Sequence, residues 1–309
     1  MSSAWMSESW TAASLDRLQR GRHILLGIEQ WIYRERSEFQ EVAIASVPDS
    51  GKGLFLDAVV EFLEIDEFIY HESFALPPLL FHPAPKRVLI EGGGDGLVLR
   101  EVLRDPRVEE VVMVEIDPLV VDACKEHLKE LHRGSFDDPR AQILTQDVFP
   151  YLEDSPNPFD VILVDLLDGY DQSAVRLYQN VLGLSRKVMA RGGIIAGFGD
   201  LAMPRMSIAP VYKGLSRILD HVVLHSAAIQ TFGGGYGFML ASHEIDFNAV
   251  AAETIVERAS ALTGELSALI PLAFPGCFAV PPYLADALDR PAPPPAAALA
   301  DEFNWLYSK

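Results

Sequence analysis

Cysteine is scarce in this chain, and the usual metal-binding sequence patterns are absent. Only two cysteines, Cys124 and Cys277, occur among 309 residues, and neither C-x-x-C nor H-E-x-x-H is present. A disulfide framework or a structural zinc site is therefore not expected. His221 and His225 flank a run typical of a strand, where their spacing would separate them by about 13 Å, too far to share a metal. We expect no metal in the functional site.

Basic residues are also few. The 25 Lys and Arg residues face 44 Asp and Glu residues, which gives a formal net charge of −19. This charge opposes binding to a polyanion, so a nucleic-acid partner is not expected. It favours small cationic ligands, above all in an acid-lined cleft. An acidic surface kept for solubility would explain the net charge equally well.

Long apolar runs are missing too. No uncharged apolar stretch reaches 18 residues, and the nearest approach, residues 266–284, is interrupted by five prolines and glycines. The first residues lack the basic start and apolar core of a secretory signal. We therefore expect a cytoplasmic protein with no membrane partner.

The most informative stretch that is present runs from Arg87 to Asp117. A short apolar run stops at a glycine-rich turn, a helix-like pattern follows, and a second apolar run ends in Glu115. This is the first half of a nucleotide-binding α/β unit. The turn contains Gly92, Gly94 and Gly96, and this G-x-G-x-G spacing is more typical of S-adenosylmethionine (SAM) enzymes than of dinucleotide enzymes. The alternative is a glycine-rich turn that merely connects a strand to a helix.

The pattern along the chain predicts an α/β fold: a Rossmann-like, mostly parallel sheet of the SAM-methyltransferase type, preceded by a small antiparallel β domain. Strands of the main sheet are expected at 87–91, 110–115, 141–145, 160–165, 192–197, 221–229 and 236–242, and helices at 96–103, 118–130, 173–189 and 207–219. In the small domain, strands are expected at 40–47, 54–56 and 59–63, with Gly51 and Gly53 supplying positive φ in the turn between the first two.

Four segments are expected along the chain. Residues 1–30 form an N-terminal helical segment, and residues 31–80 form the small β meander with a linking helix. In that helix we expect Asp66 as the N-cap and Pro77-Pro78 as the end. Residues 81–245 form the nucleoside-binding catalytic domain, and residues 246–309 form a helical and proline-rich extension.

Acidic residues follow the strands of the predicted parallel sheet. Because ligands of such sheets bind past the carboxyl ends of the strands, these acids mark the expected site. Helix capping would explain Asp117 and Asp168 as well. Glu115 can accept hydrogen bonds from ribose hydroxyls and Asp147 from an adenine amino group, whereas the others suit a sulfonium and an ammonium group. The acids of the expected site are Asp95, Glu115, Asp147, Asp165, Asp168 and Asp200.

Several motifs taken together resemble the polyamine aminopropyltransferases, the spermidine and spermine synthases. The resemblance covers about residues 33–242. The motifs are E-F-Q at 38–40, D-E-F-I-Y-H-E at 66–72, H-P-A-P-K-R-V-L-I at 82–90, G-G-G-D-G at 92–96, V-E-I-D at 114–117, F-D-D-P-R at 136–140 and D-L-L-D at 165–168. The resemblance implies the two-part fold described above, a homodimer or homotetramer, and decarboxylated SAM as the co-substrate.

The resemblance also implies roles for individual residues. Gln40, Asp95, Glu115 and Asp147 would hold decarboxylated SAM, with Asp95 on its propyl amine. Tyr70 and His71 would line the meeting point of donor and acceptor. Asp165 would orient and deprotonate the attacking amine, and Asp168, with Asp200, would bind the far ammonium of the acceptor.

Departures from the family pattern concern the acceptor half. D-G-Y-D-Q-S follows Asp165-Leu166-Leu167 where the family usually has a D-P-x-G-P-like loop, and Phe232 stands where the family commonly has a tyrosine. The C-terminal Y-Y-N motif is absent near residues 269–274. We therefore predict a non-standard amine acceptor.

Two other functions remain open from the residues. The same scaffold could carry a SAM-dependent amine N-methyltransferase or a 3-amino-3-carboxypropyltransferase that uses intact SAM. It could also be a catalytically silent binder of nucleosides or polyamines, although that alternative would predict loss of Asp165, Asp168 and Tyr70, which are all present.

Overall fold

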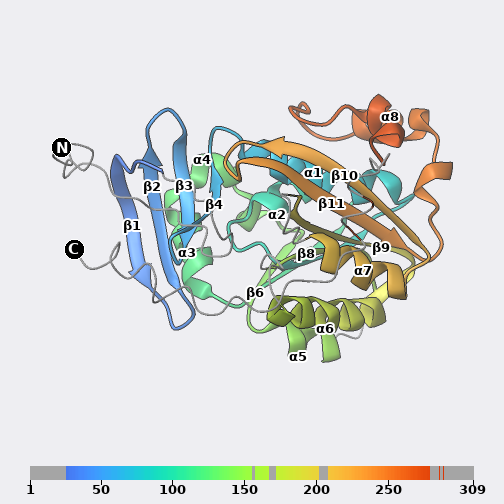
Figure 1. Ribbon diagram of the computed structural model, residues 1–309, viewed down its shortest axis with the longest axis horizontal. Coiled ribbons are helices and arrows are strands. Elements are labelled where there is room, and N and C mark those ends of the chain that lie inside the picture. The colour runs from blue at the N-terminus through green and yellow to red at the C-terminus, as the bar shows by residue number, and fades with distance from the viewer. Residues whose placement is uncertain are drawn as a thin grey trace.

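The described residues form two β-sheets, and helices lie on both sides of the larger one (Figure 1). This computed structural model describes residues 26–154, 157–166, 172–201, 208–278, 285 and 288. The small sheet is antiparallel in the order β1-β2-β3-β4, and the large sheet has the order β10-β11-β9-β8-β5-β6-β7. Strands β7, β6, β5, β8 and β9 are parallel, whereas β11 runs antiparallel to both β9 and β10. The predicted fold class is confirmed.

The elements have the following bounds. The small sheet consists of β1 (Gln30–Arg36), β2 (Glu41–Val47), β3 (Gly51–Leu56) and β4 (Val59–Leu63). The large sheet consists of β5 (Arg87–Gly92), β6 (Glu110–Glu115), β7 (Ala141–Thr145), β8 (Phe159–Asp165), β9 (Met189–Asp200), β10 (His221–Ile229) and β11 (Gly234–Ser242). The α-helices are α1 (Glu67–Phe81), α2 (Leu97–Val102), α3 (Pro118–His127), α4 (Lys129–His132), α5 (Val148–Asp154), α6 (Gln172–Val188), α7 (Ile208–Ile218) and α8 (Ala252–Ser260). The short helices are η1 (Ser135–Asp137), η2 (Phe247–Ala249) and η3 (Pro271–Phe278).

Strand β1 was not predicted, because its sequence shows no regular alternation and its second half is charged. Its pairing with β2 stabilises it, and Arg34 forms an ion pair with Glu41 across the two strands at 3.0 Å. Gly51, the first residue of β3 after the turn, has a φ of 76° as expected. The expectation for Gly53 was wrong, since this residue lies inside β3. There a Cβ atom would come within 2.6 Å of the Leu63 side chain, so close packing requires the glycine.

Helix α1 does not end at Pro77-Pro78, as the sequence predicted, but continues to Phe81. Proline removes helical hydrogen bonds, and here buried packing offsets that loss. Arginines from other segments bind the last carbonyl groups: Arg107 donates to Leu79 O at 2.9 Å, and Arg258 donates to the next two carbonyls at 2.7 and 3.0 Å. The end of the helix is therefore fixed by tertiary contacts that its own sequence does not reveal.

The start of α1 lies where the sequence predicted it, but the predicted N-cap residue uses its side chain differently. Asp66 occupies the N-cap position but makes no capping hydrogen bond. Its buried carboxylate instead accepts hydrogen bonds from the backbone N–H of Thr231, at 2.9 Å, and from the Thr231 hydroxyl. Asp66 therefore ties α1 to the turn between β10 and β11, which carries Phe232.

The hydrophobic core has a part on each face of the large sheet. Val88 and Ile90 of β5 pack in the cluster that includes α1 and α2, whereas Leu89 packs in the cluster that includes α6 and α7. Figure 1 shows α1 and α2 on one side of the sheet and α5, α6 and α7 on the other. Both faces of the parallel strands are covered, as near-continuous apolar strands require.

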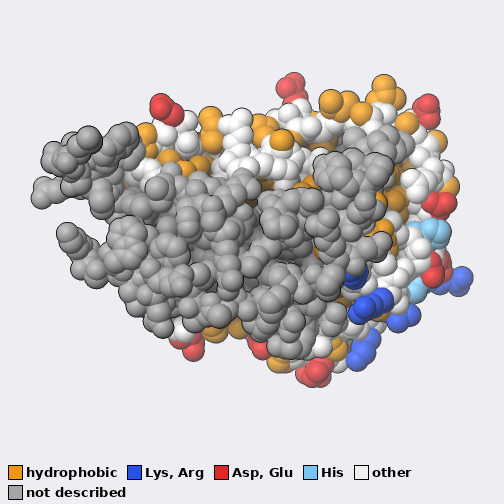
Figure 2. Space-filling model, viewed as in Figure 1, with side chains coloured by type: hydrophobic (Ala, Val, Ile, Leu, Met, Phe, Trp, Pro, Cys, Tyr) orange, Lys and Arg blue, Asp and Glu red, His pale blue; other side chains and the backbone are white. Residues whose placement is uncertain are grey.

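Surface charge is unevenly spread on the face seen in Figure 2. Lys and Arg side chains gather at the end near α6 and α7, whereas Asp and Glu side chains are scattered over the described surface of this face, that end included. None of the described helices combines the length and apolar character needed to cross a membrane. Within the described ranges, no group of three or more potential metal-ligating side chains occurs.

Candidate active site

The glycine-rich turn between β5 and α2 is shaped by contacts within the protein. Gly92 and Gly96 have positive φ values of 89° and 77°. A Cβ atom at Gly92 would lie 2.1 Å from Asp165 O, and one at Gly96 would lie 2.4 Å from the Phe136 ring. A Cβ atom at Gly94 would lie 2.8 Å from the Glu115 side chain. The three glycines thus bring the end of β5 close to the ends of the neighbouring strands.

Glu115 lies at the end of β6 and is held by backbone N–H groups. Its Oε2 accepts from Gly94 N at 3.2 Å and its Oε1 from Asp117 N at 2.9 Å. Burial raises the pKa of Glu115, the two N–H groups oppose this, and the charges of Asp117 and Asp95 add to the rise. The carboxylate is therefore fixed in orientation beside the glycine turn.

Three acids in this region cap helices. Asp117 accepts from Leu119 N at 3.0 Å, as the sequence suggested. Asp147 does the same through Oδ1, to Phe149 N at 2.9 Å, and Asp95, the residue before the N-cap Gly96, accepts through Oδ1 from Leu97 N at 2.8 Å; neither contact was predicted. Each cap uses only one carboxylate oxygen, so capping leaves Oδ2 of Asp95 and Asp147 for a ligand.

Gln40 connects the small sheet to this region. Its Nε2 donates to Asp117 Oδ2 at 3.2 Å, and the Ser37 hydroxyl donates to the same oxygen at 2.7 Å. Asp117 is fully buried and thereby joins the loop before β2 to the end of β6. Gln40 is therefore connected to Glu115 through Asp117, which contacts both residues.

Asp165 ends β8 next to the glycine turn and accepts a hydrogen bond from the Tyr70 hydroxyl at 3.0 Å. Burial raises the pKa of Asp165 to about 7, and the charge of Asp95 adds to this, while His71 and the Tyr70 hydrogen bond oppose it. Since a general base works best when its pKa lies near the working pH, Asp165 is well suited to accept a proton.

Aromatic rings surround Tyr70. The centroids of Phe198, Phe232, Tyr236 and Phe238 lie 5.4–6.0 Å from that of Tyr70, and Phe232 lies 4.9 Å from Tyr236. Phe232 is the partly exposed member of this set, which otherwise belongs to the core. Tyr70 thus contacts the aromatic cluster with its ring and Asp165 with its hydroxyl.

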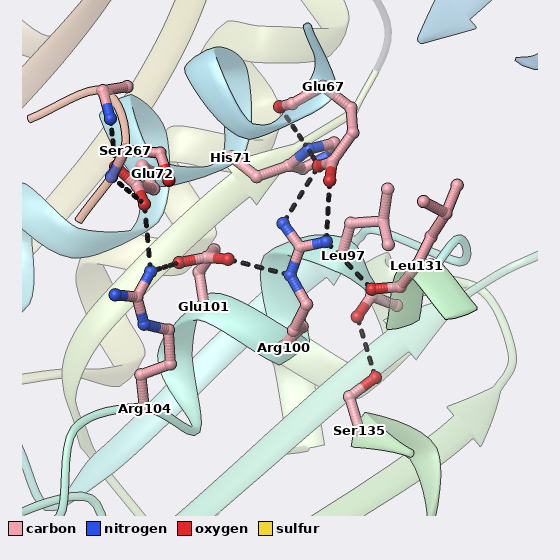
Figure 3. Close-up of polar contacts among 12 residues, drawn as sticks. Glu67, His71, Glu72, Leu97, Arg100, Glu101, Arg104, Leu131, Ser135 and Ser267 are labelled. Atoms are coloured by element: carbon pink, nitrogen blue, oxygen red, sulfur yellow. Dashed lines mark hydrogen bonds and ion pairs between the residues drawn. The ribbon is translucent and has the colours of Figure 1, made fainter. Parts of the chain in front are cut away.

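His71 belongs to a buried network of charged side chains (Figure 3). Its Nδ1 lies 2.7 Å from Glu67 Oε2, and Arg100 donates to both oxygens of Glu67 at 2.8 and 2.9 Å. Arg100 Nε also donates to Glu101 at 2.8 Å, and Arg104 binds Glu101 and Glu72. Sequence reasoning missed Glu67 and Arg100. The only signal was the spacing of Glu67 and His71, which places them on one face of a helix.

A cavity of about 360 Å³ borders this network. Glu67 and Arg100 line it, together with Arg104, Arg133, Asp138 and Glu265. His71, Asp95 and Asp165 do not line it. Glu67 and Arg100 therefore stand between the cavity and His71.

Two predicted site residues cannot be placed. Asp168 lies outside the described residues. Asp200 ends β9, where its backbone pairs with Tyr236, but its side chain lies outside the described part of the structure. The structure therefore brings together Tyr70, His71, Asp95, Glu115 and Asp165, and it leaves the far end of the acceptor site undescribed.

Comparison with known families gives two matches along the chain. The sequence model of the spermine/spermidine synthase domain matches residues 67–250, and that of the spermidine synthase tetramerisation domain matches residues 10–64. The first match spans the helix with Tyr70 and His71, the glycine turn and every acid of the predicted site.

Curated relatives and solved structures agree with these matches. A polyamine aminopropyltransferase of Aeropyrum pernix is 37% identical over 79% of this chain and 78% of its own length, and polyamine aminopropyltransferase 2 of Pseudomonas aeruginosa is 36% identical over 76% and 68%. Spermidine synthase from Thermotoga maritima superposes with a TM-score of 0.79 at 28% identity, and a spermidine synthase in complex with the transition-state analogue AdoDATO with 0.82 at 27%. Each of these two structures covers 90% of this chain, which covers 94% of each in turn.

Proposed function

The chain belongs to the spermine/spermidine synthase family and is a transferase, and we propose that it moves an aminopropyl group from decarboxylated SAM to an amine, releasing methylthioadenosine. The observation that carries the proposal is the pairing of Tyr70 with Asp165 directly beside the glycine turn. This pairing supports Asp165 as a proton acceptor at the point where donor and acceptor would meet. The names of the relatives support the reaction class, and the site residues support its chemistry.

The donor half is formed by the ends of β5, β6 and β7. Glu115, fixed by two backbone N–H groups, would accept hydrogen bonds from the ribose hydroxyls. Asp147 would accept from the adenine amino group, and Gln40 would close the site from the small sheet. Asp95, with Oδ2 unused by its cap, would hold the ammonium of the propyl arm. Gly92, Gly94 and Gly96 would let the nucleoside approach the backbone.

The acceptor half supplies the base. An alkyl amine with a pKa near ~10 is almost wholly protonated at pH 7, and freeing it costs roughly 4 kcal/mol. The amine nitrogen attacks the carbon beside the sulfonium, the carbon–sulfur bond breaks, and the sulfur leaves as a neutral thioether. Asp165 takes the proton, and Tyr70 holds the carboxylate in place during the transfer. Alignment of the two reactants supplies much of the remaining rate enhancement.

The acceptor that we propose is a non-standard amine. The aromatic cluster around Tyr70 would pack against its alkyl chain and attract its ammonium by cation–π contact. Phe232 lacks the hydroxyl that the family commonly has there, so the cluster offers one hydrogen-bonding group fewer. His71 would line the meeting point, and Asp168 with Asp200 would bind the far ammonium.

We further propose a homo-oligomer, a dimer or a tetramer, assembled through the residues that match the tetramerisation domain. We also propose the four segments predicted from the sequence, with boundaries at residues 30, 80 and 245. Sedimentation velocity of the full chain would measure the assembly state, and a monomer at micromolar concentration would contradict it.

Product identification tests the reaction. The protein is incubated with decarboxylated SAM or intact SAM and a panel of diamines and triamines, and the nucleoside product is identified by mass spectrometry. Methylthioadenosine from decarboxylated SAM, with an amine heavier by one aminopropyl group, supports the proposal. S-adenosylhomocysteine would show methyl transfer. Methylthioadenosine from intact SAM would show carboxypropyl transfer or an intramolecular reaction, and tight binding without turnover would show a silent binder.

Asp165→Asn is the matching variant. It keeps the shape of the side chain and a contact for Tyr70 but removes the proton acceptor, so turnover should fall by about 100-fold or more. Donor affinity, measured separately by calorimetry, should change little. Near-normal turnover of this variant would refute the assigned base.

A further inference from the structure

The protonation of His71 is constrained by its surroundings. The ring is buried, and its Nδ1 lies 2.7 Å from both the carbonyl oxygen and Oε2 of Glu67. Both partners are acceptors, because Arg100 donates to each oxygen of the Glu67 carboxylate and the pKa of Glu67 falls to about 2. In that shift burial acts upward, and contacts with His71 and Arg100 outweigh it. Nδ1 of His71 therefore carries a hydrogen in every protonation state, and Nε2 is the nitrogen that titrates.

Nε2 of His71 faces the donor side. It lies 3.9 Å from Asp95 Oδ2, the carboxylate oxygen not used for helix capping. A neutral ring would direct a lone pair at this carboxylate, whereas a protonated ring would direct an N–H. Burial lowers the pKa of His71, but the hydrogen bond and charge of Glu67, with the charge of Asp95, raise it overall.

The described charged and titratable groups around His71 come from α1, the glycine turn, α2 and β8. The groups that act on the ring or respond to its charge are Glu67 and Tyr70 of α1, Asp95 and Arg100 at and after the glycine turn, and Asp165 of β8. In the absence of ligand their charges alternate from Arg100 through Glu67 and His71 to Asp95. This order compensates the negative charge of Asp95.

A cationic donor would change this balance. A charge-assisted hydrogen bond is usually about 2.8 Å long. If a nitrogen lay at that distance from both His71 Nε2 and Asp95 Oδ2, the angle between the two contacts at the nitrogen would be about 90°. An ammonium group accommodates this angle. The ammonium could donate to Nε2 only if that nitrogen had lost its own hydrogen. The incoming positive charge also disfavours a second cation at contact distance.

We propose that His71 holds a proton in the empty enzyme and releases it from Nε2 to the solvent when the ammonium of the donor binds at Asp95. Glu67 and Arg100 act as positioning residues, because they keep the other ring nitrogen bonded to Glu67. This inference rests on the proposed function, in which the donor is a cation held by Asp95. The nucleoside product lacks that ammonium, so its binding leaves the proton on His71.

Two measurable consequences follow from proton release. The affinity for the donor should rise with pH by up to about tenfold per unit while His71 titrates, because one proton leaves for each donor bound. The affinity for methylthioadenosine should stay nearly constant over the same range. Asp165 also loses protons near pH 7, so the contribution of each residue must be separated.

Nuclear magnetic resonance on wild-type protein provides the direct test. The histidines are labelled with ¹³C at Cε1, and the His71 signal is assigned with the variant His71→Gln. At pH 7, saturating decarboxylated SAM should move this signal towards the neutral position, whereas methylthioadenosine should leave it unchanged. A signal that stays in place with decarboxylated SAM bound, or that moves equally with both ligands, would overturn the inference.

Binding constants between pH 6 and 8 test the positioning residues. Asp165→Asn should keep the pH dependence of donor binding that arises from His71, and His71→Gln should lose it. Glu67→Gln should shift it to lower pH, because the ring loses its negative partner. Glu101→Gln is the matched control: Glu101 binds Arg100 but does not contact His71, so the pH dependence should match the wild type. If Glu67→Gln and Glu101→Gln shifted the pH dependence of donor binding equally, the network would have only a structural role.

The outcomes separate the two proposals. If decarboxylated SAM neither binds nor yields methylthioadenosine, the proposed function is wrong. If it binds and reacts while the His71 signal does not move, only the proton release is wrong.

Discussion

Glu67 and Glu91 are both buried, but they lie in different surroundings. Glu67 belongs to α1 and faces α2, whereas Glu91 belongs to β5 and contacts α6 on the other side of the large sheet (Figure 1). Arg100 and His71 bind Glu67, and its pKa falls to about 2. Among the residues that the structure describes, Glu91 has Ser185 as its one side-chain partner, and burial raises its pKa to about 8 against the smaller opposing effect of that hydrogen bond. Partners, rather than burial, decide which glutamate is charged.

The geometry at Ser185 supports a neutral Glu91. Ser185 Oγ lies 2.7 Å from Glu91 Oε1 and 2.8 Å from Val181 O. The hydroxyl has one hydrogen, so both contacts can be full hydrogen bonds only when the Glu91 carboxyl carries a proton. Among the described residues, Oε2 of Glu91 has no partner. The face that carries Tyr70 and His71 therefore keeps its charges, and the opposite face keeps its acid neutral.

The largest effect on this comparison is expected from removing Arg100, the cation that binds both carboxylate oxygens of Glu67. Arg100→Met leaves Glu67 buried with His71 as its remaining charged partner, so the free energy of unfolding should fall by about 3–5 kcal/mol. Urea unfolding at pH 7 measures the change. A loss below ~1 kcal/mol would show that Glu67 can be satisfied without Arg100.

Glu91→Gln should act in the opposite direction. In the wild type the folded pKa of about 8 lies above the ordinary glutamate pKa of 4.5, so the folded state binds more protons between these values and loses stability as pH rises. The variant lacks this titration. Its advantage should therefore grow by up to about 1.4 kcal/mol per pH unit across that window and level off above pH 8. Parallel stability curves for the two proteins between pH 5 and 8 would contradict a neutral Glu91.

Asp165 lies between the two extremes, with a pKa of about 7. The assigned base must be ionised to accept the proton of the amine. With donor saturating, kcat/KM for the acceptor should fall by up to about tenfold per unit below pH 7 and level off above it. Initial rates measured from pH 5.5 to 8.5 give this profile. A kcat/KM that does not change with pH below 7 would exclude Asp165 as the base.

The exposed ion pair between Arg34 and Glu41 should show the smallest effect. Both side chains contact solvent, and water screens the pair. Glu41→Gln should change the free energy of unfolding by at most ~1 kcal/mol, measured in the same urea series. A loss of unfolding free energy as large as that of Arg100→Met would mean that an ion pair stabilises the fold equally whether it is buried or exposed.

Much of the large sheet could be predicted from the sequence, because its strands are near-continuous apolar runs. β6, β7 and β10 have the predicted bounds, and β9 is longer at both ends. Helix α5 was missed, and the helix predicted at 118–130 divides into α3 and α4. The continuation of α1 through two prolines depends on Arg107 and Arg258, which no local pattern contains.

The candidate site was predictable to the extent that it follows the strand ends. Asp95, Glu115 and Asp165 meet there because parallel strands place their carboxyl ends at one edge. Their roles stay predictions. The pairing of Glu67 with Arg100 joins residues 33 positions apart, and the neutral state of Glu91 depends on Ser185, 94 positions away. Such contacts are fixed by tertiary packing and leave no periodic signal in the sequence.

Helix α1 is fastened by residues that are synthesised much later than the helix itself. Thr231 holds Asp66, Arg258 holds the last carbonyls, and the backbone of residues 267–269 holds Glu72. On the ribosome, a nascent chain that has emerged only as far as β9 already contains Tyr70, Asp165 and the α1 contacts of Arg100 and Arg107, but it lacks these three later contacts. Residues 231–269, which are translated after β9, therefore add the last anchors of the helix that carries Tyr70.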